Sequence, residues 1–71
     1  MRTLDLHGVK HANVEDELAN FFFWEYPNFK QYTVVTGNSL EMQKIVREWL
    51  DRHNYVYYIP SNNLGEIKVS E

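Results

Sequence analysis

The first hydrophobic residues of the chain alternate strictly with polar ones. Leu4 and Leu6 lie between Thr3, Asp5 and His7, which is the period-two pattern of a strand with one buried face. Residues 3–7 are therefore predicted to form a strand. Asp5 and His7 are expected to share its face away from the core.

A helical spacing follows after Gly8. The apolar residues that fall at i, i+4, i+7 and i+8 are Val14, Leu18, Phe21 and Phe22. Asn13 precedes three carboxylates and is expected to cap this helix. Pro27 disfavours helical geometry in the residue before it, so the helix is expected to end near Tyr26. The four aromatic residues 21–24 cannot all face one core, so Phe23 or Trp24 is expected at a sheet edge or a partner.

The rest of the chain gives three further strands and one helix. Residues 31–36 are β-branched and aromatic and stop at Gly37, which is typical of a strand. Ser39 is expected to cap a second helix, whose apolar stripe is the clearest periodic signal in the chain: Met42, Ile45, Val46, Trp49 and Leu50. Residues 55–59 and 66–70 predict two strands joined by the turn residues 61–65.

This order predicts an α/β fold, a single βαβαββ two-layer sandwich. Right-handed crossovers place both helices on one face of a mixed four-stranded sheet and leave the other face open. The 71 residues are expected to form one domain. Because the chain has no cysteine, packing and not disulfide bonds must hold this fold.

Charge and hydropathy narrow the possible partners and location. The net charge of −3 argues against bulk attraction to nucleic acid or to an anionic lipid surface. Any nucleic-acid role must therefore come from a local site, and binding should be weak without a protein partner that delivers the substrate. No signal-peptide pattern or membrane span is found, so a cytoplasmic protein is expected.

Candidate chemistry collects at the ends of the first two strands. In parallel α/β units, ligands bind where the carboxyl ends of strands turn into helices. The candidate residues in and beside these two loops are Asp5, His7, Gly8, Lys10, His11, Thr36, Gly37, Asn38 and Ser39. A histidine can transfer protons near neutral pH, a carboxylate can orient it, and backbone N–H groups can hold a phosphate. The set suits phosphodiester chemistry.

Simpler interpretations compete with this one. Asp5 can serve as a loop cap and His7 as an ordinary surface residue. Asp5, His7 and His11 could also ligate a divalent metal, but they lack a fixed helical spacing, and no metal or other cofactor is expected. Exposed tyrosines could stack on bases, or they could pack across strands or mediate self-association. The tyrosines considered are Tyr32, Tyr55, Tyr57 and Tyr58.

Four sequence blocks together resemble the small MutS-related (Smr) domain over nearly the whole chain. They are LDLHG at residues 4–8, VVTG at 34–37, VREWL at 46–50 and GEIKV at 65–69. The resemblance implies a βαβαββ sandwich that associates with DNA or RNA, and many members are endonucleases. It makes Asp5 and His7 the catalytic pair. The family usually has Gly-x-Gly in the second loop, where this chain has Gly37, Asn38 and Ser39. The chain resembles short stand-alone variants of the domain, such as those in phages.

The leading hypothesis is therefore an endonuclease that acts on RNA, or nicks DNA, by acid/base chemistry at Asp5 and His7. RNA is favoured because its 2′-hydroxyl can attack the adjacent phosphate, with Lys10 or loop N–H groups stabilising charge. The alternative is a non-catalytic module that binds a protein or nucleoprotein through the open sheet face. A homodimer through Trp24 or Phe23 is a third hypothesis.

Overall fold

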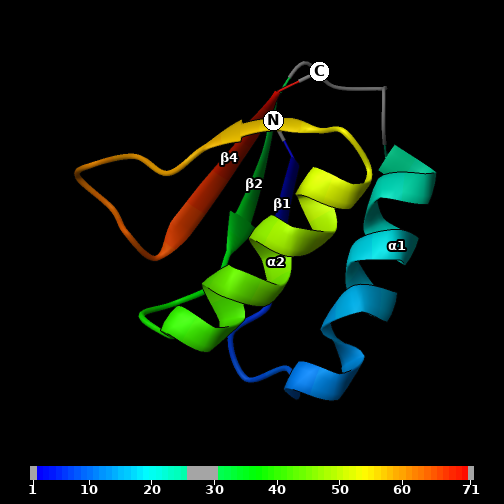
Figure 1. Ribbon diagram of the computed structural model, residues 1–71, viewed down its shortest axis with the longest axis horizontal. Helices are drawn as coiled ribbons and strands as arrows, with labels where there is room; N and C mark the ends of the chain where they lie inside the picture. Colours follow the sequence, from blue (N-terminus) through cyan, green and yellow to red (C-terminus); the bar gives the residue numbers. More distant parts are fainter. Residues whose placement is uncertain (1, 26–30, 71) are drawn as a thin grey trace.

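The computed structural model describes residues 2–25 and 31–70. The elements in chain order are β1 (Arg2–Asp5), a 3-10 turn (His11–Asn13), α1 (Val14–Glu25), β2 (Gln31–Val35), α2 (Leu40–Arg52), β3 (Val56–Tyr58) and β4 (Glu66–Ser70). The predicted βαβαββ order is confirmed (Figure 1). The predicted end of the first helix at Tyr26 lies outside the described residues.

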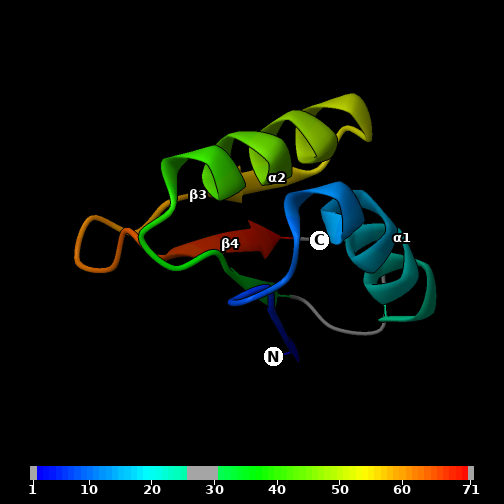
Figure 2. The same ribbon diagram turned by 90° about the horizontal axis from the view of Figure 1, so that it is seen from below.

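The four strands form one mixed sheet in the order β1-β2-β4-β3. β1 and β2 are parallel, whereas β4 runs antiparallel to both of its neighbours. Figure 2 shows both helices on the same side of the sheet. The predicted two-layer arrangement with one open sheet face is thus confirmed, and among the described strands β1 and β3 lie at the edges.

The core lies between the sheet and the two helices. Its buried hydrophobic residues are Leu6, Val14, Leu18, Phe22, Tyr32, Val34, Met42, Val46, Trp49, Leu50, Ile67 and Val69. The predicted stripes of both helices therefore face the sheet. The run of aromatic residues is divided as expected, since Phe22 is 2% exposed while Phe23 and Trp24 are 76% and 72% exposed.

The two predicted helix caps have different outcomes. Ser39 Oγ accepts a hydrogen bond from the backbone N–H of Met42 at 3.1 Å, so the cap of α2 is confirmed. Asn13 instead lies in the 3-10 turn, where its N–H donates to the carbonyl of Lys10 at 2.8 Å. The chain is already helical before α1 begins, and the predicted Asn13 cap is wrong.

Polar contacts fasten α2 to the elements beside it. Arg52 forms an ion pair of 2.6 Å with Glu15 of α1, but both side chains are more than half exposed, so its contribution to stability is small. The hydroxyl of Tyr57 donates to Asp51 Oδ1 at 2.9 Å. This second contact links β3 to the last turn of α2, and it makes the free energy of unfolding depend on pH.

The pKa of Tyr57 is raised above its ordinary value of about 10, first by burial and then by the hydrogen bond and the charge of Asp51. Folding therefore favours the protonated phenol. The stabilisation that the protonated phenol gives is complete below pH 10, and it is lost as the pH rises through the pKa that Tyr57 has in the folded protein. We expect the free energy of unfolding in urea to fall across this alkaline range, and Tyr57→Phe to reduce the fall.

Tyr58→Phe is the matched control, because Tyr58 is the next residue of the same strand and its side chain is exposed. It should leave the alkaline dependence of the free energy of unfolding unchanged. An identical pH dependence for wild type and Tyr57→Phe would contradict the assigned role of the hydroxyl.

The helices within the described ranges 2–25 and 31–70 do not include one that is long and apolar enough to cross a membrane.

Candidate functional site

The two predicted loops lie side by side at the carboxyl ends of β1 and β2 (Figure 1). The N–H of Leu6 donates to the carbonyl of Val35 at 2.9 Å, which extends the contact between the strands beyond Asp5. A Cβ placed on Gly37 would lie 3.8 Å from Cδ2 of the His7 ring. The first loop therefore carries its histidine directly to the second loop.

His7 lies in a tight turn that Asp5 and Gly8 define. The N–H of Val9 donates to the carbonyl of Leu6 at 3.0 Å, and Gly8 has a φ of +83°, which corresponds to a type II turn. Asp5 Oδ1 accepts the backbone N–H of His7 at 2.8 Å. The carboxylate thus holds the backbone of the turn, and the exposed imidazole of His7 is carried at a fixed point of it.

This turn also explains where β1 ends. The predicted strand extends to His7, but the observed strand ends at Asp5. The carbonyl of Leu6 accepts the N–H of Val9 and so does not continue the pairing with β2, while the carboxylate of Asp5 accepts the N–H of His7. The alternation itself is correct, because Leu6 is buried whereas Asp5 and His7 are exposed.

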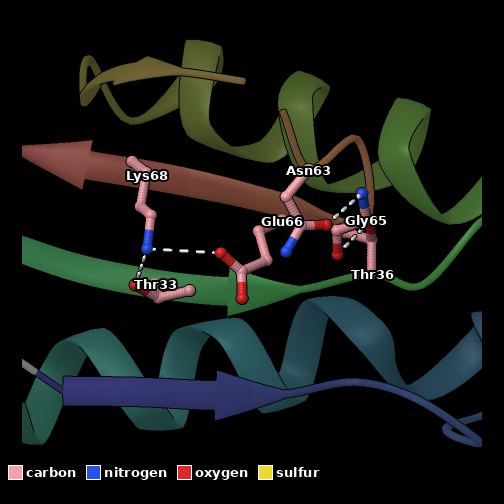
Figure 3. A network of polar contacts seen from close by, with 6 residues as sticks. All are labelled: Thr33, Thr36, Asn63, Gly65, Glu66 and Lys68. Atoms are coloured by element: carbon pink, nitrogen blue, oxygen red, sulfur yellow. Dashed lines mark hydrogen bonds and ion pairs between the residues drawn. The ribbon is translucent and has the colours of Figure 1, made fainter. Parts of the chain in front are cut away.

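The second loop is fastened to the hairpin between β3 and β4. The backbone N–H groups of Thr36 and Gly37 both donate to the carbonyl of Gly65, at 2.8 and 3.1 Å. The buried hydroxyl of Thr36 lies 3.2 Å from the same carbonyl (Figure 3). Thr36 and Gly37 were predicted to bind phosphate, but in this structure their donors are directed to Gly65. Ser39 is occupied as the helix cap, and Asn38 is exposed.

Gly65 is a residue whose role sequence reasoning missed. The sequence predicts only a turn here, yet the carbonyl of Gly65 accepts the two N–H groups of the second loop, and its N–H donates to Asn63 Oδ1 at 3.1 Å (Figure 3). The Thr36 hydroxyl lies between the carbonyls of Gly37 and Gly65, at 3.1 and 3.2 Å. A Cβ on Gly65 would lie 3.3 Å from the carbonyl oxygen of Gly37. Its position within the GEIKV block is the one signal that marked it.

We expect Gly65→Ala to lower the free energy of unfolding by about 1–3 kcal/mol, because the atom nearest to the added methyl group is a backbone oxygen, which yields less readily than the end of a side chain. Urea denaturation measures the change. Ser61→Ala, at an exposed position of the same connection, is the control and should change the free energy by less than about 0.5 kcal/mol. Equal stability of Gly65→Ala and wild type would show that the two loops are not tightly packed.

The remaining candidates of the first loop are Lys10 and His11. Both side chains are exposed, and the 3-10 turn that begins at His11 places them just before α1. In the ranges 2–25 and 31–70, no three His, Asp or Glu side chains are grouped as a metal site would require. The loop thus presents an imidazole at His7 and a cation at Lys10 on one exposed connection.

The open sheet face is lined by a polar network. Lys68 Nζ lies 3.0 Å from Thr33 Oγ1 and 3.3 Å from Glu66 Oε1 (Figure 3). Lys68 is paired in register with Tyr58, which is 51% exposed. This face therefore combines a half-buried charged pair with an exposed aromatic ring.

The other tyrosines considered for base stacking lie on the core side. Tyr32 is fully buried, and Tyr57 pairs in register with the buried Val69. The ring of Tyr55 lies 4.9 Å from that of Phe22. The register of β3 on β4 thus leaves Tyr58, among the described residues, as the tyrosine of the open face.

Comparison of the chain with models of protein families, with curated proteins and with solved structures finds no match.

Proposed function

We propose that this chain is an Smr-like, nucleic-acid-associated endonuclease that cleaves RNA with His7 as its acid/base group. The observation that supports this most directly is the placement of His7. Its exposed ring is carried on a turn held by Asp5, and it lies against Gly37 of the neighbouring strand-end loop. Imidazole is the side chain best suited to proton transfer near neutral pH.

The proposed reaction uses the RNA strand as its own nucleophile. Neutral His7 accepts the proton of a 2′-hydroxyl while that oxygen forms a bond to the adjacent phosphorus. The bond from phosphorus to the 5′-oxygen breaks, and the leaving oxygen takes a proton from solvent. The products are a 2′,3′-cyclic phosphate and a 5′-hydroxyl. The ammonium of Lys10, three residues along the loop, stabilises the negative charge that develops on the phosphate.

Asp5 acts in this proposal as a positioning residue. Its carboxylate contacts the main chain of His7, and it thereby fixes the turn on which the imidazole is carried. The N–H groups of Thr36 and Gly37 donate to Gly65 and are not assigned to the phosphate. The charge stabilisation therefore falls to Lys10. The net charge of −3 makes RNA binding by the chain alone weak, so cleavage by the chain alone is expected at high protein concentration, and a protein partner that delivers the RNA would raise the rate.

The deciding experiment uses a labelled single-stranded RNA, the same sequence as DNA, and an RNA with single 2′-deoxy substitutions, all in the presence of EDTA. We expect cleavage of RNA alone, no cleavage at a 2′-deoxy position, and products that end in a cyclic phosphate. Cutting of the DNA at a similar rate, or products with a 5′-phosphate, would rule out the 2′-hydroxyl mechanism.

A second candidate function is a non-catalytic module that binds a protein or nucleoprotein through the open sheet face. It is favoured by the exposed Tyr58 beside Lys68 and Glu66, and by the engagement of the second loop with Gly65. Titration of labelled RNA at low and high salt separates the two candidates. A steep salt dependence indicates phosphate contacts, whereas the absence of RNA binding and cleavage favours the module.

A further inference from the structure

A groove lies between the edge strand β1 and helix α1, apart from the strand-end loops. It has a volume of about 270 Å³ and is lined by Leu4, Glu17, Asn20, Phe21 and Trp24. The four helix residues fall at i, i+3, i+4 and i+7 and so form one stripe along α1. The groove combines apolar side chains with one carboxylate and one amide, and Trp24 is 72% exposed there.

The groove runs beside the edge of the sheet that the backbone of β1 forms. Among the strands of residues 2–25 and 31–70, β1 pairs with β2 alone. Because the N–H of Leu6 bonds to β2, the two-residue repeat of a parallel ladder directs the backbone groups of Leu4 to β2 as well. The N–H and C=O groups of Thr3 and Asp5 then face outward. An exposed edge of this kind is a template for an added strand.

The charge beside the groove selects the kind of strand that can be added. α1 has Glu15, Asp16 and Glu17 in its first turn, and residues 14–25 contain no Lys, Arg or His. Two copies of the chain that met through β1 would bring two such helices together, and their like charges would repel. A segment that carries cations would instead meet complementary charge at Glu17.

We propose that the edge of β1 and the adjoining groove bind an extended peptide segment in which apolar residues alternate with lysine or arginine. The peptide backbone pairs with the outward groups of Thr3 and Asp5 and becomes a fifth strand. Its apolar side chains contact Leu4, Phe21 and Trp24, and a basic side chain pairs with Glu17. This surface is separate from the open sheet face, and it shares with the strand-end loops only the main chain of Asp5, whose carboxylate is engaged with His7.

The test titrates the isotope-labelled full chain with a blocked seven-residue peptide of alternating lysine and valine, followed by NMR. We expect the largest shifts in the amides of Thr3, Leu4 and Asp5 and in the indole of Trp24. A peptide with glutamate in place of lysine should bind at least about tenfold more weakly. Two further peptides are methylated on the backbone nitrogens of either their odd or their even residues. One should not bind and the other should bind as before, since only one edge of the added strand bonds to β1.

Glu17→Lys should reverse the preference, so that the acidic peptide binds better than the basic one. Glu48→Lys is the control, because Glu48 is an exposed carboxylate on α2 outside the groove, and it should leave the preference unchanged. Shifts confined to the open sheet face, equal binding of both peptides, or no binding at millimolar peptide would overturn the proposal. So would the same shifts appearing with protein concentration alone, which would identify a second copy as the occupant.

Discussion

Phe22→Ala is expected to leave most of the protein unfolded in buffer at 25 °C. The ring of Phe22 stacks on Trp49 at 5.7 Å and contacts the rings of Tyr32 and Tyr55 at 5.5 and 4.9 Å. Removal of a buried phenyl ring costs about 3–5 kcal/mol. A core this small supplies a net stability of only about 3–5 kcal/mol. The loss is therefore comparable with the whole free energy of unfolding.

Phe23→Ala is the matched control for this experiment. It removes the same ring from the next position of α1, where the side chain is 76% exposed. Its change in the free energy of unfolding should stay within about 0.5 kcal/mol of wild type. Urea denaturation followed by circular dichroism compares the three proteins. Similar stabilities for Phe22→Ala and Phe23→Ala would mean that α1 is rotated relative to the described orientation.

The pair also shows why local pattern predicted the core so well. Helix α1 buries Val14, Leu18 and Phe22, which are spaced by four, and Phe21, which also belongs to the predicted stripe, is partly buried against the core. The same reasoning holds for β4, where Ile67 and Val69 are buried and their neighbours are not. The spacing of apolar residues along a helix or strand depends only on residues close in sequence, so it can be recognised before the fold is known.

The features that the sequence did not predict depend on residues far apart in the chain. The carbonyl of Gly65 accepts donors from Thr36 and Gly37, 29 and 28 residues earlier, and this occupies groups that had been assigned to phosphate. The position of Tyr58 as the open-face tyrosine depends on how β3 pairs with β4. Both follow from strand register, which no short-range pattern specifies.

The proximity of the His7 ring to Gly37 agrees with the predicted topology, because parallel neighbours end at the same edge of a sheet and so bring the two loops side by side. The sequence could not decide which group the Asp5 carboxylate contacts. The sequence offered two roles for it, as a partner of the imidazole or as a loop cap, and in the structure it accepts the backbone N–H of His7. The catalytic roles of Asp5 and His7 stay predictions.

His7→Ala is expected to lower the rate of RNA cleavage at least about 100-fold, which is the lower range for removal of a general acid/base group. The side chain is exposed, so the variant should unfold at the same urea concentration as wild type. His11→Ala is the matched control, since it removes an imidazole from the same loop, and it should change the rate less than about threefold. Equal losses in both variants would assign the effect to loop charge and not to proton transfer at His7.

Two substitutions at Asp5 then separate positioning from direct chemistry. The carbonyl oxygen of asparagine can still accept the N–H of His7, so Asp5→Asn should preserve the turn and most of the activity. Asp5→Ala removes the acceptor, leaves the N–H of His7 without its partner and should lower the rate about tenfold or more. If Asp5→Asn is instead as inactive as His7→Ala while it folds normally, the negative charge of Asp5 takes part in the reaction. Full activity in Asp5→Ala and His7→Ala alike would refute the catalytic assignment and leave the binding module as the remaining function.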